Sequence, residues 1–144
     1  MKKALLLLAL LSAMGWLGGC KSVPTEIPPD LSAADYFQRA QEASDAGRYA
    51  LALKYYQSFL ERYPDERNRG LWARYEIALL HSKMKDTATA LRLFDELLAT
   101  YAGEDAAQLP QGPRILAEKI KAKLLASMPK AAPAQAAPAA QSQE

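Results

Sequence analysis

Apolar side chains recur at three- and four-residue spacing between residues 33 and 128, which is the pattern of helices that bury one face. Glycine, proline or polar residues interrupt this pattern at four places. The spacing predicts helices over residues 33–46, 49–63 and 69–85, a fourth from Asp86 or Thr87 to about Tyr101, and a fifth over residues 113–128. The predicted fold class is therefore all-α.

Short sequence signals support these helix boundaries. Ser32 and Asp35 have the spacing of a capping box, in which each side chain binds the backbone amide of the other. Gly47 suits the left-handed backbone at a helix end, and the short turn around it predicts that the first two helices pack antiparallel. Pro64 ends the second helix, and residues 65–68 are predicted to form a loop.

The predicted core consists of one apolar stripe on each of the first four helices. The stripes contain Tyr36, Phe37, Ala40 and Ala43; Tyr49, Ala52, Leu53, Tyr56, Phe59 and Leu60; Leu71, Trp72, Tyr75, Ala78, Leu79 and Ser82; and Ala90, Leu91, Phe94, Leu97, Leu98 and Tyr101. Ala52 is expected at the closest approach of the first two helices, because a small residue there lets the two backbones come together.

The chain contains an internal repeat with a constant offset of 38 residues. The equivalent pairs are Phe37 and Tyr75, Ala40 and Ala78, Ser44 and Ser82, Ala52 and Ala90, Leu53 and Leu91, Tyr56 and Phe94, Phe59 and Leu97, Leu60 and Leu98, and Tyr63 and Tyr101. Repeats of this length are typical of helical arrays, whose units bury their apolar faces against their neighbours.

The first copy resembles a tetratricopeptide repeat. The residues that carry the resemblance are Tyr36, Gly47, Tyr49, Ala52, Leu53, Tyr56, Leu60 and Pro64. The second copy departs from the pattern, because Lys85 stands at the turn glycine, Thr87 at the aromatic position and Ala102 at the proline. The resemblance implies two antiparallel helical hairpins over residues 32–128, stacked as a short α-solenoid.

The fifth helix is predicted to cover the open end of the second hairpin. Leu116, Ile120 and Leu124 lie at helical spacing, and Pro113 is predicted to be the first residue of the helix, a position that favours proline. Ile115 and Leu125 flank this stripe, and several charged residues lie between the apolar positions. The alternative is a basic amphipathic helix that lies on a membrane.

Residues 1–19 have the parts of an export signal, with a basic start, a short apolar run and a small-residue exit. The sequence Leu17-Gly18-Gly19-Cys20 resembles the bacterial lipobox, which implies cleavage before Cys20 and acylation of its thiol. The alternative is an ordinary signal peptide followed by an incidental cysteine. Lys21 after the cysteine implies, by the sorting rule of such lipoproteins, an outer-membrane location facing the periplasm.

Two segments flank the helical region. Residues 20–31 combine the lipidated cysteine with a proline-rich stretch, which is predicted to be an extended tether outside the core. Residues 129–144 consist largely of alanine, proline and glutamine, and this composition predicts a disordered tail.

Composition argues against catalysis and nucleic-acid binding. The chain has 18 basic and 16 acidic residues, and removal of Lys2 and Lys3 with the signal would leave 16 of each. His81 is the only histidine, and the only cysteine is expected to carry lipid, so a metal site and a catalytic triad lack candidates. No glycine-rich phosphate loop is present. No enzyme activity, small-molecule substrate or cofactor other than the covalent lipid is predicted.

The tetratricopeptide resemblance implies that the first helix of each hairpin lines a groove for a partner protein. The predicted groove residues are Phe37, Gln41, Ser44, Trp72, Glu76, Leu79 and Lys83. Phe37, Gln41, Tyr75 and Leu79 replace the residues that clamp a terminal carboxylate in one version of this groove, which favours an apolar ligand. The alternative for Phe37 and Trp72 is a purely structural role in the core.

The combination of a lipid anchor with helical repeats resembles envelope proteins of the BamD and YbgF type. The resemblance implies a non-catalytic adaptor that binds other envelope proteins, with outer-membrane protein assembly or envelope maintenance as its setting. The sequence leaves two alternatives open. The first is a pilotin-like or transporter-associated lipoprotein that escorts one client, and the second is a structural protein that self-associates.

Overall fold

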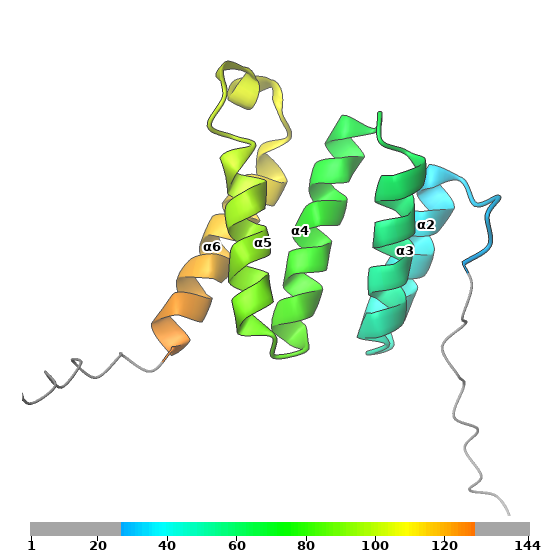
Figure 1. Ribbon diagram of the computed structural model, residues 1–144, viewed down its shortest axis with the longest axis horizontal. Coiled ribbons are helices and arrows are strands. Elements are labelled where there is room, and N and C mark those ends of the chain that lie inside the picture. The colour runs from blue at the N-terminus through cyan, green and yellow to red at the C-terminus, as the bar shows by residue number, and fades with distance from the viewer. Residues whose placement is uncertain (1–26, 129–144) are drawn as a thin grey trace, which may run out of the picture.

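The computed structural model describes residues 27–128. The predicted signal segment, the lipidation site at Cys20, the first part of the tether and the tail at 129–144 lie outside the described residues. The helices, with the labels of Figure 1, are α2 (Ala33–Asp45), α3 (Tyr49–Arg62), α4 (Arg67–Lys83), α5 (Thr87–Ala99) and α6 (Gln111–Ser127), with a short 3-10 helix at Glu104–Gln108. Residues 27–128 contain no strand, which confirms the all-α prediction.

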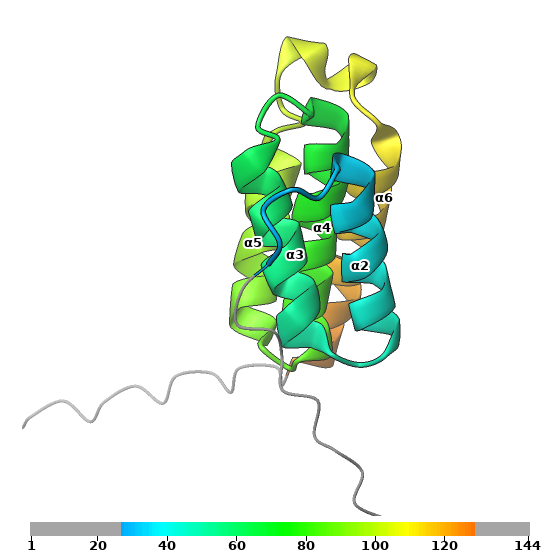
Figure 2. The same cartoon turned by 90° about the vertical axis from the view of Figure 1, so that its right-hand side faces the viewer.

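The helices form two antiparallel hairpins that stack side by side. α2 packs on α3, α4 packs on α5, and α3 joins the hairpins by packing on α4 (Figure 1). α6 packs on α5 and α4, as predicted for a helix that covers the second hairpin. Figure 2 shows α2 and α6 toward one side of the stack and α5 toward the other, with α3 and α4 between them. The arrangement is a short solenoid.

The predicted capping signals are present. Ser32 Oγ accepts a hydrogen bond from the Asp35 amide at 3.2 Å, and the Asp35 carboxylate accepts from the Ser32 amide at 3.1 Å. The hydrogen bonds from Ser32 hold the pKa of Asp35 below its usual range. Asp86 caps α5 by accepting from the Thr89 amide at 3.2 Å. Gly47 has a left-handed backbone with φ of +70°.

The core divides into two clusters, and α4 contributes to both. Ala73, Ile77 and Leu80 face the first hairpin, whereas Leu71, Tyr75 and Ala78 face the second hairpin and α6. The single stripe predicted for this helix therefore missed one of its two buried faces. The same contact buries Leu51 and Tyr55 of α3, which the predicted stripe also omitted, because α4 covers the side of α3 that an isolated hairpin would expose.

Two local predictions were wrong. Arg67 and Asn68 begin α4 and do not belong to the preceding loop. α6 begins at Gln111, so Pro113 is its third residue and not its first, and its ring is buried. Ile115 and Leu125 of α6 remain exposed, whereas Ala117 is buried in the interface with the second hairpin.

The end of the tether is part of the folded domain. Ile27 and Leu31 pack against the first core cluster, although the proline-rich stretch was predicted to stand clear of it. Tyr36 donates a hydrogen bond to the Pro28 carbonyl at 3.2 Å, and Tyr63 donates to the Leu31 carbonyl at 2.7 Å. Ile27 and Leu31 thus cover apolar surface of the first hairpin. The tyrosine hydroxyls provide hydrogen-bond donors for the backbone carbonyls of this segment.

Candidate partner-binding groove

A pocket of about 440 Å³ lies between α2 and α4. It is lined by Ala34, Phe37, Gln41, Tyr56, Arg69, Trp72 and Glu76. Phe37, Gln41, Trp72 and Glu76 are four of the seven predicted groove residues. The fold therefore brings these four together, although they come from helices separated by the whole of α3.

The aromatic wall of the pocket is anchored in the core. The Phe37 ring makes edge contacts with Tyr56 and Phe59, at centroid distances of 5.3 and 4.8 Å. The Trp72 ring makes an edge contact with Tyr75 at 6.1 Å. Phe37 and Trp72 are half-buried, so each packs in the core with one part and lines the pocket with another. The core packing of both residues is confirmed, and their role in partner binding stays a prediction.

Trp72 also supports the start of α6. Its indole ring lies so close to Gly112 that a Cβ at this glycine would stand 2.6 Å from a ring carbon. Only glycine permits this approach of helix backbone to an aromatic ring. The position of the indole in the pocket is thereby coupled to the docking of α6.

Polar groups lie at the rim of the pocket. Gln41 donates its side-chain amide to Asp45 at 3.1 Å, and Arg69 is 3.5 Å from Glu66. Burial raises the pKa of Glu76, an effect that Lys83 partly offsets and Asp45 reinforces. No ion pair engages the Glu76 carboxylate among residues 27–128, so a half-buried acid stands beside an aromatic wall.

Ser44 and Lys83 bind each other. The Lys83 ammonium donates to Ser44 Oγ at 3.1 Å and lies 5.6 Å from the centre of the Tyr49 ring. Ser44 is only 4% exposed, so its hydroxyl is occupied by the lysine and does not face an open groove. This pair bridges the C-terminal ends of α2 and α4.

Leu79 belongs to a different pocket, between α4 and α6, with a volume of about 450 Å³. Its lining is formed by Leu79, Ser82, Lys83, Lys85, Thr87, Ile120, Lys123, Leu124 and Ser127. The single groove predicted from the sequence is thus two pockets with different chemistry. Sequence reasoning missed the second one because its floor depends on where α6 docks.

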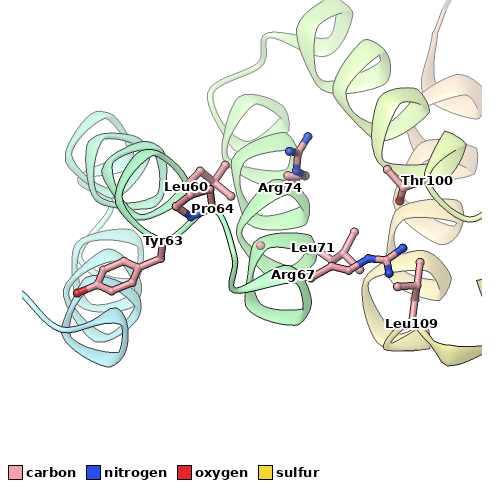
Figure 3. Close-up of a pocket in the computed structure, with 9 residues that line it drawn as sticks. Leu60, Tyr63, Pro64, Arg67, Leu71, Arg74, Thr100 and Leu109 are labelled. Carbon is pink, nitrogen blue, oxygen red and sulfur yellow. The ribbon is translucent and has the colours of Figure 1, made fainter. Parts of the chain in front are cut away.

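A third pocket, of about 320 Å³, lies where α3, α4 and α5 meet the segment before α6. Figure 3 shows Arg67 and Arg74 projecting from α4 into this region, between Leu60 on one side and Leu109 on the other. Arg67 is 3.8 Å from Asp105. The pocket escaped sequence reasoning because Arg67 had been placed in a loop.

Between residues 27 and 128 no cluster of histidine, cysteine and acidic side chains is arranged to hold a metal ion. No helix in this range has the length and apolar character needed to cross a membrane.

The chain is similar to a protein of Treponema pallidum (strain Nichols) that is described as uncharacterized. The two sequences are 34% identical over 97 residues, which cover 66% of this chain and 39% of the Treponema protein. The chain thus spans well under half the length of this relative. No family model matches the chain, and no solved structure matches it.

Proposed function

We propose that the protein is a non-catalytic, lipid-anchored adaptor that binds another protein of the bacterial envelope through the pocket between α2 and α4. The observation that carries this proposal is the pocket itself. It combines an aromatic wall, formed by Phe37, Tyr56 and Trp72, with amide, guanidinium and carboxylate groups at its rim. Pockets of this kind accept an apolar side chain of a partner and fix its orientation with a few polar contacts.

The chemistry of the pocket restricts the occupant. The aromatic wall favours an apolar or aromatic side chain, and the desolvated carboxylate of Glu76 favours a basic group beside it. The proposed ligand is therefore a protein segment in which an apolar residue stands near lysine or arginine. Such a ligand differs from the terminal carboxylate that one version of the tetratricopeptide groove binds.

The envelope location is supported by the sequence. The lipobox-like residues before Cys20 favour acylation of its thiol, and Lys21 favours the outer membrane, facing the periplasm. Two or more acyl chains give stable anchoring where one gives only reversible binding. Metabolic labelling with palmitate tests this part. Label should enter the wild-type protein and be lost in Cys20→Ala, and a wild-type protein without label would contradict the anchor.

The pocket can be tested without removing a core side chain. Ala34 lines the pocket and is exposed, so Ala34→Leu should fill the space while leaving the aromatic contacts intact. Ala50→Leu is the matched control, because Ala50 is also exposed and is also the second residue of its helix.

The measurement is in-cell photo-cross-linking from a photoreactive residue at Gln41. A cross-linked partner protein should appear in the wild type and with Ala50→Leu, and should be lost with Ala34→Leu. A partner that persists when the pocket is filled would rule out this pocket. A cross-link only to a second copy of the chain would favour the self-associating alternative.

A further inference from the structure

The pocket between α4 and α6 is basic and partly apolar. Three lysines, Lys83, Lys85 and Lys123, line it, and no acidic side chain does. Its apolar floor is formed by Leu79, Ile120 and Leu124, and its hydroxyl groups come from Ser82, Thr87 and Ser127. Such a lining fits an anionic group attached to an apolar body.

Lys85 is held in an unfavourable backbone conformation. Its φ is +69°, and the equivalent position of the first hairpin carries Gly47 with φ of +70°. A lysine in this conformation costs stability that glycine would not cost. Backbone strain of this kind is concentrated at functional positions. The side chain of Lys85, which lines the pocket, is the feature that glycine would remove.

The lysines of α6 differ in their contacts. Lys121 forms an ion pair with Asp95 of α5 and so fastens the helix to the second hairpin. Lys123 lies in the α4–α6 pocket, and neither it nor Lys85 forms an ion pair within residues 27–128. Lys83 donates a hydrogen bond to the neutral hydroxyl of Ser44, and it too forms no ion pair within residues 27–128.

Exposed apolar side chains gather at the same end of the molecule. Met84 follows α4 and is 37% exposed, Leu125 in the last turn of α6 is 51% exposed, and Met128 after α6 is 49% exposed. The end of α4 and the end of α6 lie at the lower edge of the bundle in Figure 1. Ile115, the fourth large apolar side chain exposed between residues 27 and 128, lies near the other end of α6.

We infer that this end of the domain, which we call the basic end, is a contact surface for a bilayer that contains anionic lipids. A headgroup phosphate binds among Lys83, Lys85 and Lys123, and Met84, Leu125 and Met128 enter the interfacial layer. Lysine next to exposed apolar side chains is the combination that interfacial binding requires. An acidic peptide fits less well, because Met84, Leu125 and Met128 are exposed at helix ends and line none of the three pockets described above.

The reach of the chain agrees with this contact. Ile27 is fixed to the first hairpin and is seven positions from Cys20, so a lipid at the cysteine holds the domain within about 25 Å of the bilayer. A 17-residue helix such as α4 is about equally long, so the tether is short enough to keep the whole length of the domain close to the bilayer. This step rests on the proposed anchor, whereas the chemistry of the basic end does not.

The test uses the full chain reconstituted in phosphatidylcholine nanodiscs with and without phosphatidylglycerol. Lysines are labelled with a water-soluble acylating reagent, and each site is quantified by mass spectrometry. Lys85 and Lys123 should react about fivefold more slowly in anionic discs, which corresponds to about 1 kcal/mol of attraction per lysine near an anionic surface. Lys119, exposed on α6 outside the pocket lining, serves as the internal reference.

Variants and competitors make the result specific. Lys85→Gly combined with Lys123→Gln should abolish the protection of Lys83 in anionic discs, and Lys119→Gln should retain it. Equal labelling of all sites in both discs would overturn the inference. The inference would also be overturned if inorganic phosphate, added to the protein in neutral discs, protected these lysines as strongly as anionic discs do. The site would then bind free phosphate and not a bilayer.

The two proposals fail in different ways. Loss of the protein from neutral discs contradicts the proposed anchor, whereas the labelling in anionic discs alone decides the surface contact. The cross-link from Gln41 should be unchanged by the lysine variants, because the α2–α4 pocket and the α4–α6 pocket share no lining residue.

Discussion

Gly47 and Lys85 occupy equivalent positions in the two hairpins and share a left-handed backbone, with φ of +70° and +69°. The surrounding hydrogen bonds are also equivalent. The Gly47 amide donates to the Ser44 carbonyl at 2.9 Å, and the Lys85 amide donates to the Ser82 carbonyl at 3.0 Å. The offset of 38 residues therefore extends from the sequence to the backbone of the turn. The second turn keeps its shape even though its residue is poorly suited to it.

Lys85→Gly should stabilise the domain by about 1 kcal/mol, because glycine adopts the left-handed region without steric cost and only part of that gain is offset by a more flexible unfolded chain. Urea denaturation measures the change in the free energy of unfolding. Lys85→Ala is the control, since it removes the charge and keeps the strain, and it should give no such gain. Equal stability of the glycine and alanine variants would contradict the account of the turn.

Ala52→Leu should destabilise the domain by roughly 1–3 kcal/mol through overpacking. Ala52 is fully buried where α2 packs on α3, and its repeat equivalent Ala90 is fully buried between α4 and α5. Ala50→Leu, at an exposed position of the same helix, should change the melting temperature little. A similar melting temperature for both variants would place the closest helix contact elsewhere.

Gly112→Ala should destabilise the domain by roughly 1–3 kcal/mol, because the new methyl group overlaps the Trp72 ring, so that α6 or the ring with its Tyr75 contact must shift. Trp72 fluorescence should shift as well. Gly70→Ala is the matched control, since Gly70 is also helical and its Cβ would lie 3.7 Å from the nearest atom, a Leu60 side-chain carbon. The control should gain stability from helix propensity. Two variants of equal stability would argue against the close contact of Trp72 with α6.

Glu76→Gln should stabilise the domain at neutral pH, because burial raises the pKa of Glu76 and its ionised form is therefore unfavourable in the folded state. The folded chain takes up a proton at this group before the unfolded chain does as pH falls. The advantage of the glutamine variant should thus shrink as pH falls through the raised pKa, and disappear below the ordinary value of 4.5.

The measurement is the melting temperature of wild type and Glu76→Gln between neutral pH and pH values below the ordinary range of a glutamate. Glu61→Gln, at an exposed position of α3, changes the net charge by the same amount and serves as the control. Parallel pH profiles for Glu76→Gln and wild type would show that the Glu76 carboxylate is not penalised by burial.

The apolar stripes of α2 and α5 were the most readily predicted from the sequence. α2 and α5 each bury one main face, and their stripes around Ala40 and Phe94 follow the helical period. α4 was less predictable because it lies between two hairpins and buries Leu80 on one side and Tyr75 on the other. A helix with two buried faces has no single apolar stripe for periodicity to reveal.

The candidate site was predicted only in part. Phe37 and Trp72 were correctly placed on the helices that line the pocket, since the resemblance to helical repeats orders these helices. The division of the groove was not predictable, because Ser44 is covered by Lys83 across 39 residues of chain and Leu79 faces α6. Both contacts depend on the distance between helices that are not neighbours in the sequence.

The sequence by itself determined the helices, their approximate ends and the duplication of a hairpin, because these follow from local periodicity, caps and turn residues. Tertiary structure decided which side chains share a pocket, and it placed lysines and exposed apolar side chains at one end of the bundle. The physical reason is that helix rotation and spacing are set by the packing of many side chains together. A sequence pattern records the period of each helix and not the angle at which two helices meet.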